Sequence, residues 1–238
     1  METLKNKHIL ITGATGGIGA AAARMLAGSG ARLFLTGRNA DKLAAVAASC
    51  QVAPDHCFAA DITQLSEVLA LKEQYFQVLP SIDILVNAAG TGIIRPLEQL
   101  DEALFMQSLQ VNLYAPFLLM RAFLPVMKEN RKGLVIHIPG VLGKVPMAGA
   151  AAYTAAKYGL VGMLQSIREE LKRTEIRITQ LYLGGTDSPF WDTIDLKVQR
   201  EKMISAEEAG RAIWFLCQQP SSGVVSEMVL QPFNHQAI

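Results

Sequence analysis

Two side chains that can take part in proton transfer lie one helical turn apart in the segment Tyr153-Thr154-Ala155-Ala156-Lys157. Because residues four apart share one face of a helix, we expect the phenol and the ammonium to point the same way. A nearby ammonium favours the phenolate form and so lowers the pKa of a phenol. Tyr153 is therefore a candidate general acid or base near neutral pH, although the same spacing is common on helix surfaces without a catalytic role.

A glycine-rich turn near the N-terminus joins the apolar run 8–12 to the alanine-rich segment 20–27. A strand, a tight turn and a helix in this order place a phosphate group at a helix N-terminus, where free N–H groups and the helix dipole favour negative charge. Gly13 allows the sharp turn, Gly17 a close approach to phosphates, and Gly19 close packing of the helix. We expect a dinucleotide here rather than an ordinary strand-to-helix connection, bound by Gly13, Thr15, Gly16, Gly17, Ile18 and Gly19.

The end of the second apolar run, Thr36-Gly37-Arg38, bears on which dinucleotide is bound. An acidic residue at this place would hydrogen-bond the adenosine ribose and repel a 2′-phosphate, but the sequence has Gly37 there. The guanidinium of Arg38 favours a 2′-phosphate, and Thr15 can donate a further hydrogen bond to it. NADP(H) is therefore the preferred cofactor and NAD(H) a possible one; the alternative is that Arg38 is an ordinary surface residue.

Two further strand ends carry residues suited to the same ligand. Asp61 can accept a hydrogen bond from the adenine amino group, and Ile62 can pack on the ring, although Asp61 could equally cap a helix. The small residues that follow the fourth apolar run allow a flat ring or a ribose to approach the backbone, with simple tight packing as the alternative. These residues are Asn87, Ala88, Ala89 and Gly90.

Apolar runs alternate with helical segments along the chain, which predicts an α/β fold with a parallel sheet and helices on both faces. The expected strands are 7–12, 32–36, 55–59, 83–87, 133–138, 176–182 and 227–230, and the expected helices are 18–29, 39–49, 64–78, 101–128, 151–173 and 205–218. Asn39, Thr63 and Ser205 are expected N-caps, and Gly133 an expected stop for the fourth helix. Without repeats or linkers, residues 1–238 are expected to form a single domain.

Composition limits the partners. The 238 residues are half hydrophobic and carry a net charge of +1, which argues against nucleic acid or an anionic membrane as the main partner. We expect no signal peptide and no apolar run long enough to span a bilayer. Three cysteines without a C-x-x-C motif are typical of free thiols in a reducing cytoplasm. The spacing of Cys50, His56 and Cys57 fits no common metal site, so no metal is expected.

Taken together, the ordered motifs resemble those of the short-chain dehydrogenase/reductase (SDR) family in its compact form. The resemblance covers essentially the whole chain and rests on Thr12-Gly13-x-x-x-Gly17-x-Gly19, Asn87-Ala88-Ala89-Gly90, Asn112, Tyr153-x-x-x-Lys157 and the Gly184 region. It implies a Rossmann fold, here a doubly wound seven-stranded parallel sheet with three helices on each face. It also implies a nicotinamide cofactor and hydride transfer to or from a carbonyl/alcohol pair.

The resemblance also assigns roles. Tyr153 would be the acid/base and Lys157 would hold the nicotinamide ribose, while Asn112 would bind a water through its helix backbone and pass protons to solvent. Gly184 and Thr186, after the sixth strand, would contact the cofactor. The family usually has Pro-Gly where this chain has Leu183-Gly184.

The sequence departs from the family pattern at Gly140, where the family has a serine that hydrogen-bonds the substrate oxygen. Losing one preorganised donor of this kind typically costs about 10²–10³ in rate. Three accounts remain open: a slower enzyme in which substrate or water supplies the hydrogen bond, substitution by Thr186 or Ser188, or a cofactor-binding pseudoenzyme or sensor with little turnover. His137 is another conceivable donor, but a packed core histidine is the stronger interpretation.

In the family layout, a short loop near 186–204 folds over the substrate. Phe190, Trp191 and Met147 would then line a site next to Gly140, which favours an apolar carbonyl or alcohol substrate. The alternative for the two aromatic residues is a subunit interface. The expected helices 101–128 and 151–173 carry apolar residues on more than one face, which indicates a subunit contact. A homodimer or homotetramer built on these helices is what the resemblance implies.

Overall fold

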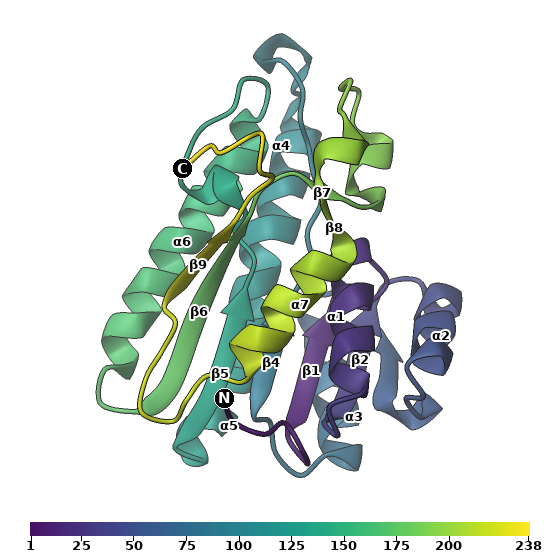
Figure 1. Cartoon of the computed structure of the whole chain (residues 1–238), viewed down its shortest axis with the longest axis vertical. Coiled ribbons are helices and arrows are strands. Elements are labelled where there is room, and N and C mark those ends of the chain that lie inside the picture. The colour runs from purple at the N-terminus through teal and green to yellow at the C-terminus, as the bar shows by residue number, and fades with distance from the viewer.

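The computed structural model describes residues 1–238, and its centre is a parallel sheet of seven strands (Figure 1). The strand order is β3-β2-β1-β4-β5-β6-β9. The strands are β1 (His8–Thr12), β2 (Arg32–Gly37), β3 (Cys57–Ala59), β4 (Ile84–Asn87), β5 (Lys132–His137), β6 (Glu175–Leu183) and β9 (Glu227–Leu230). The predicted doubly wound Rossmann fold is confirmed. The order reverses between β1 and β4, which is where open sheets of this type bind ligands.

Helices cover both faces of the sheet (Figure 1). One face carries α1 (Gly17–Ala27), α2 (Ala40–Ser49) and α7 (Ala206–Cys217); the other carries α3 (Leu65–Val78), α4 (Glu102–Leu109), α5 (Ala115–Glu129) and α6 (Ala151–Leu171). Each face of the sheet has its own hydrophobic core, and successive strand residues belong to the two cores in turn. Ile9 and Ile11 pack on the first face, and Leu10 packs on the second. This alternation follows from the two-residue period of a strand, and it makes every central strand apolar on both faces.

The expected helix 101–128 is interrupted in the structure. Between α4 and α5, a π-helical turn (Gln110–Tyr114) leads to a bond from the Ala115 N–H to the Gln110 carbonyl, five residues back. Turns of this kind displace carbonyl groups from the regular helical pattern and often mark functional sites. Asn112 lies within it, and its side chain is buried.

The same helical run corrects the expectation about bilayer-spanning segments. Residues 102–129 are long and apolar enough to cross a membrane by length and composition, with a mean hydropathy of 1.2 over the most apolar window. Half of that window is buried inside the fold. Its apolar side chains are therefore explained in part by packing against α3 and the sheet.

Two of the predicted helix caps are confirmed and one is wrong. Asn39 accepts a hydrogen bond from the Lys42 N–H, and Ser205 forms a capping box with Glu208. The third helix has Gln64 as its N-cap, without a side-chain bond, because the Thr63 N–H and hydroxyl both donate to the Asp61 carboxylate.

The predicted stop at Gly133 is also wrong. Helix α5 ends at Glu129, and the chain reverses through Arg131, whose φ is 55°. Gly133 lies inside β5 and pairs with Ile176 of β6. The turn that ends this helix therefore comes before the glycine, at a non-glycine residue in the left-handed region.

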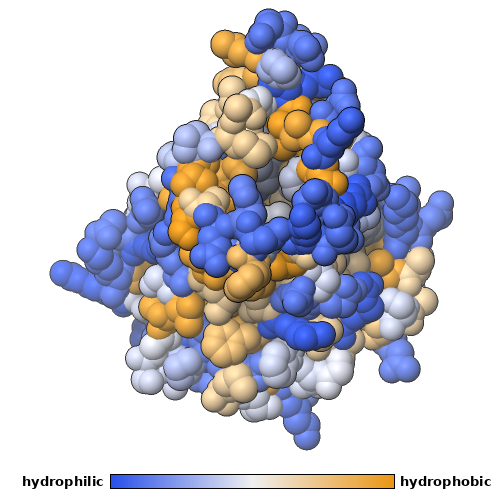
Figure 2. Space-filling model, turned by 45° about the horizontal axis from the view of Figure 1, so that its top comes forward, coloured by the Kyte–Doolittle hydropathy of each residue, from blue (hydrophilic) through white to orange (hydrophobic).

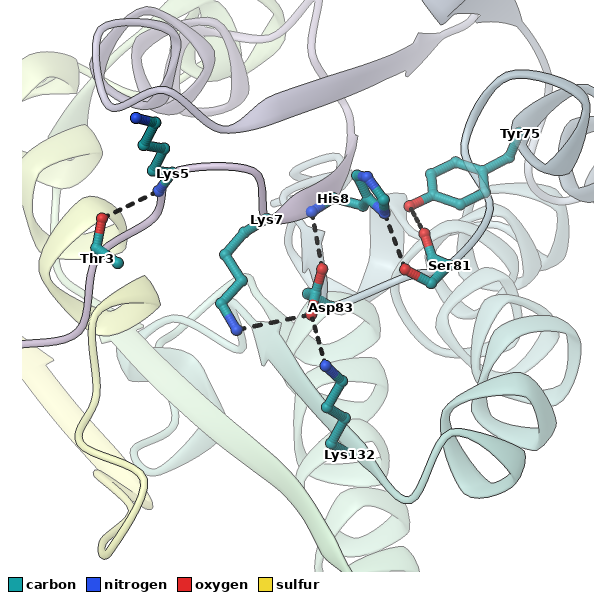
Figure 3. Close-up of polar contacts among 8 residues, drawn as sticks. All are labelled: Thr3, Lys5, Lys7, His8, Tyr75, Ser81, Asp83 and Lys132. Carbon is teal, nitrogen blue, oxygen red and sulfur yellow. Dashed lines mark hydrogen bonds and ion pairs between the residues drawn. The ribbon is translucent and has the colours of Figure 1, made fainter.

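Asp83 organises the edge of the sheet opposite the strand carboxyl ends (Figure 3). Its carboxylate accepts the His8 N–H at 2.9 Å and lies 3.7 Å from the ammonium groups of both Lys7 and Lys132. Its own N–H donates to the His8 carbonyl, and the His8 ring bonds the Ser81 hydroxyl. These contacts fix how β1, β4 and β5 are aligned at their starts.

A second, two-stranded sheet lies above the carboxyl edge of the main sheet (Figure 1). It consists of β7 (Thr186–Asp187) and β8 (Ile204–Ser205), in parallel pairing. The segment between them contains two short 3₁₀ turns, Pro189–Thr193 and Arg200–Lys202. We call residues 188–203 the lid; both of its ends are fixed by this small sheet.

Candidate active site

A cavity of about 540 Å³ opens at the carboxyl edge of the sheet, over β1, β2 and β4. It brings together nine of the residues predicted to bind a dinucleotide: Gly13, Thr15, Gly16, Arg38, Asp61, Ile62, Ala88, Ala89 and Gly90. The predicted residues Gly17, Ile18, Gly19 and Asn87 do not line it. Gly37, already noted at the end of the second strand, also lines it, as do six residues that the sequence analysis did not assign to the ligand: Thr36, Asn39, Lys42, Ala60, Thr63 and Val111.

The glycine turn brings Gly13 and Gly16, the residues just before α1, to the wall of the cavity. Gly13 has a φ of 67°, and a Cβ there would lie 2.6 Å from the Ala89 nitrogen. Gly16 is the N-cap of α1, without a side-chain bond, and the first turn holds no acidic residue. No side chain caps α1, so the N–H groups of its first turn have no side-chain acceptor and can bind an anion.

The far end of this cavity is basic. Arg38 and Lys42 line it and neither forms an ion pair. A Cβ at Gly37 would lie 2.8 Å from the Thr15 hydroxyl, so Thr15 occupies the space that a side chain at position 37 would need. The one carboxylate in the lining, Asp61, already accepts two hydrogen bonds from Thr63.

Asn87 has a different place from the one predicted. Its side chain is buried and joins three strands: its carbonyl oxygen accepts from Thr12 at 2.7 Å, and its amide nitrogen lies 3.1 Å from Nδ1 of His137. His137 is fully buried, as expected for a core histidine. Burial, with the Lys157 charge as a second cause, lowers the pKa of His137 to about 3, so the ring is neutral.

Tyr153 and Lys157 lie on one face of α6, as their spacing predicts. The Lys157 ammonium donates to the Ile138 carbonyl at 3.0 Å and lies 5.4 Å from the centre of the Tyr153 ring. Burial lowers the pKa of Lys157 to about 8. Burial also raises the pKa of the Tyr153 phenol, contrary to the expected lowering, because the loss of hydration outweighs an ammonium held by Ile138.

Asn112 and Lys157 meet the first cavity at Gly90. A Cβ placed on Gly90 would lie 3.2 Å from Oδ1 of Asn112 and 3.7 Å from Nζ of Lys157. The Asn112 amide donates to the Thr91 carbonyl and accepts from the Thr91 N–H, so it fixes the loop after β4. A ligand over Gly90 therefore has an ammonium beneath it.

A second cavity, of about 550 Å³, lies at the carboxyl ends of β5 and β6. Tyr153 faces it, together with the residues predicted to contact a substrate: Gly140, Met147, Phe190 and Trp191. The Phe190 ring lies 5.8 Å from that of Tyr153 and 5.3 Å from that of Trp191. Gly184 also lines this cavity, whereas Thr186 lines neither of the two.

Gly140 has a backbone conformation that serine rarely adopts. Its φ is 70° and its ψ is 170°, a region open almost only to glycine. A Cβ there would have one neighbour within 4 Å, the Leu183 carbonyl at 3.5 Å, so the conformation and not the space excludes a side chain.

The hydroxyl groups proposed to replace the serine are already engaged. Thr186 donates to the Gly184 carbonyl at 3.1 Å, Ser188 donates to the Thr186 carbonyl at 3.4 Å, and neither lines the second cavity. Substitution by either is therefore not what the structure shows.

Ser188 instead contacts the glycine turn, a role that the sequence analysis missed. A Cβ on Gly17 would lie 2.7 Å from Cβ of Ser188 and 3.1 Å from Cδ of Pro189. The start of the lid thus rests on the first turn of α1. Only the fold of residues 186–205 reveals this contact, because nothing in the local sequence marks it.

Comparison with known proteins agrees with this geometry. A sequence profile described as short chain dehydrogenase matches residues 7–199. The chain is 32% identical over 235 residues to an uncharacterized oxidoreductase of Staphylococcus saprophyticus, covering 98% of this chain and 100% of that protein. It is 30% identical to a sepiapterin reductase of Chlorobaculum tepidum, covering 95% and 96% of the two chains.

Solved structures show the same likeness. A metagenomic short-chain oxidoreductase in complex with NADP has a TM-score of 0.84 and 32% identity, over 97% of this chain and 99% of that one. An alcohol dehydrogenase from the archaeon Thermococcus sibiricus, complexed with 5-hydroxy-NADP, has a TM-score of 0.88 and 25% identity, over 98% and 100%.

Proposed function

Because the chain belongs to the short chain dehydrogenase family of oxidoreductases, we propose that it transfers hydride between NADP(H) and a carbonyl/alcohol pair. The observation that carries the proposal is the place of Tyr153 and Lys157 between two cavities. Tyr153 faces one cavity, and Lys157 approaches the other at Gly90. When bound, the nicotinamide would supply or accept the hydride. Side chains of the protein bind and orient the cofactor and substrate and transfer the proton.

Tyr153 is the proposed acid/base. Its hydroxyl donates a proton to the substrate oxygen when a carbonyl is reduced and accepts one when an alcohol is oxidised. The Lys157 ammonium would hold the nicotinamide ribose hydroxyls, while burial keeps the Tyr153 phenol protonated and able to donate. Asn112 binds a water through the backbone of the π turn and passes protons toward solvent. Gly184, which lines the second cavity, is proposed to contact the cofactor as well.

The preference for NADP(H) over NAD(H) rests on the basic end of the first cavity. Arg38 and Lys42 provide two positive charges without carboxylate partners, beside the position where Gly37 replaces an acidic side chain. A 2′-phosphate there would meet both charges and the Thr15 hydroxyl. The free N–H groups at the start of α1 hold the diphosphate.

The test of this function is Tyr153→Phe. We expect a loss of about 10²–10⁴ in turnover of a carbonyl panel, since the proton donor is gone, with NADPH binding retained and tighter than NADH binding. Tyr158→Phe is the matched control, because Tyr158 lies in the same helix but bonds the Lys144 carbonyl at the surface. Wild-type turnover in Tyr153→Phe would refute the acid/base role.

Gly140 supports a second candidate function, a cofactor-binding protein with little turnover. Tight NADPH binding by the wild-type protein, without NADPH consumption on a broad carbonyl panel, would establish this alternative. We favour the enzyme, because the cavity in front of Tyr153 is open and Gly140 has a backbone conformation of its own.

We further propose that the protein forms one cooperative domain, works in the cytoplasm and assembles as a homodimer or homotetramer. The support for assembly is an apolar surface on α4, α5 and α6. It contains Met106, Leu109, Leu113, Tyr114, Phe117 and Met163.

A further inference from the structure

The cavity in front of Tyr153 has an apolar interior and a polar rim. The apolar lining includes Ile94, Leu142, Met147, Phe190 and Trp191. The rim is formed by exposed side chains of the lid and of the C-terminal segment: Lys197, Gln199, Lys202, Asn234 and His235. Figure 2 views the molecule with the top of Figure 1 turned forward, and on this face several apolar patches lie between hydrophilic side chains.

The charges at this cavity are all of one sign. Lys197, Lys202 and His235 line the cavity, and none of its lining residues is acidic. Neither lysine has a carboxylate within 4.0 Å: Asp187 and Asp192 pair with Arg200, and the remaining lid aspartate, Asp195, is exposed and forms no ion pair. Lys202 also lines a neighbouring hollow together with Glu201 and Glu208, but it forms no ion pair with either.

The C-terminal part of the rim is held in place. The Gln231 side chain accepts hydrogen bonds from the N–H groups of Ala237 and Ile238 and donates to the Ile238 carbonyl at 2.8 Å. The His235 N–H donates to the Pro232 carbonyl, so the segment folds back on itself. This closes residues 231–238 into a loop that carries Asn234 and His235.

We infer that the substrate is amphiphilic: an apolar body that bears the reacting carbonyl or alcohol, and an anionic group, a carboxylate or a phosphate, held by Lys197, Lys202 and His235. The inference rests on the proposed function, because Tyr153 defines the reacting end. An apolar body packs among Met147, Phe190 and Trp191 with its oxygen at Tyr153, and the anion then lies at the rim. A neutral substrate leaves both ammonium groups without a partner.

The kinetic test compares carbonyl compounds that differ in charge alone. Benzaldehyde, 4-carboxybenzaldehyde and 4-formylphenyl phosphate are reduced with NADPH. We expect kcat/KM for at least one anionic aldehyde to exceed that for benzaldehyde about tenfold at low salt, since two partly exposed charge pairs contribute a few tenths to one kcal/mol each. Whichever of the two anionic aldehydes has the higher kcat/KM shows whether the rim prefers a carboxylate or a phosphate. The preference should shrink in about 1 M salt, where the screening length falls to about 3 Å.

Variants assign the preference to the rim. In the double variant Lys197→Gln/Lys202→Gln, the ratio of kcat/KM between anionic and neutral aldehydes should fall toward one. The control Lys5→Gln/Lys172→Gln also removes two positive charges, but from surface positions away from the cavity, and it should keep the wild-type ratio. An equal preference in wild type and double variant, or no preference at all, would overturn the inference.

A binding measurement separates this inference from the proposed function. Trp191 lines the cavity and Trp214 does not, so in a Trp214→Phe background the tryptophan fluorescence reports on this site. 4-Carboxybenzyl alcohol should bind about tenfold more tightly than benzyl alcohol, and the lysine double variant should abolish the difference. If no aldehyde is reduced but this difference is seen, the proposed function fails and the anion site stands. Equal binding of both alcohols refutes the site even where both aldehydes are reduced.

Discussion

At the scale of single residues, Gly140 shows why an absent serine is not simply a missing hydroxyl. Gly140→Ser and Gly140→Ala should each destabilise the protein by about 1–3 kcal/mol, because both force a side chain into the same unfavourable backbone region. The two variants carry equal strain, so their comparison isolates the hydroxyl. We expect kcat/KM of the serine variant to stay within about tenfold of that of the alanine variant.

Urea unfolding and carbonyl reduction assays check this expectation. A serine variant about 10² faster than the alanine variant would show that the hydroxyl reaches the substrate oxygen, and that its loss alone limits the natural protein.

Lys157 gives a pH-dependent prediction at the same scale. Burial lowers its pKa to about 8, so the free protein loses this positive charge as the pH rises through that value. We expect kcat/KM for carbonyl reduction to fall above about pH 8, because the ammonium that we propose to hold the cofactor ribose is neutralised. The Tyr153 phenol titrates well above this range, since burial raises its pKa.

The matched variant is Lys157→Arg, whose guanidinium stays charged throughout the accessible range. Whatever the absolute rate of this variant, the fall of its kcat/KM with rising pH should begin at a higher pH than in the wild type. A fall at the same pH in both proteins would mean that another group is responsible.

At the scale of elements, Asp83 illustrates how one side chain aligns three strands. Asp83→Ala removes the acceptor for the His8 N–H and both lysine contacts, whereas Asp83→Asn keeps an acceptor and loses the charge. We expect a loss in unfolding free energy of about 2 kcal/mol for alanine and about 1 kcal/mol or less for asparagine. Urea denaturation measures both. Equal losses would mean that the ion pairs, and not the hydrogen bond, dominate.

The main elements were predictable because each has a local pattern. The strand β1 has three consecutive apolar residues, Ile9 to Ile11, and Ser205 with Glu208 forms a cap that can be read directly from the sequence. The strands β7 and β8 have two residues each and are held only by pairing with one another across the lid. The π turn around Asn112 has no local signal, and neither has the positive φ of Gly140.

The same distinction applies to the site. Tyr153, Lys157 and the glycine turn could be predicted because local spacing along the chain decides their geometry: residues four apart share a helix face, and closely spaced glycines form a tight turn. Lys42 lines the first cavity because α2 places it there. The rim residues Lys197 and His235 line the second cavity because the lid and the C-terminal loop fold over it. Long-range folding brings these residues together, and no short segment encodes it.

At the scale of the whole molecule, the hollow on α4, α5 and α6 is the surface that most needs a partner. It has a volume of about 510 Å³, and Gln110 is its one polar lining residue. Met106, Tyr114 and Phe117 expose 45%, 44% and 40% of their surface there, and the Tyr114 and Phe117 rings stack on one another. A contiguous apolar surface of this kind is typical of subunit interfaces.

We therefore expect a second copy of the chain to pack on this surface and light scattering to give a mass that is a multiple of 25.8 kDa. Phe117→Arg places a charge at the centre of the interface and should yield the monomer mass. Leu69→Arg is the matched control, since Leu69 is an equally exposed apolar residue on α3, outside the hollow. A monomeric wild-type protein, or an unchanged mass in Phe117→Arg, would refute the interface. Because assembly stabilises the folded chain by mass action, the melting temperature should rise with concentration in the wild type and the control but not in Phe117→Arg.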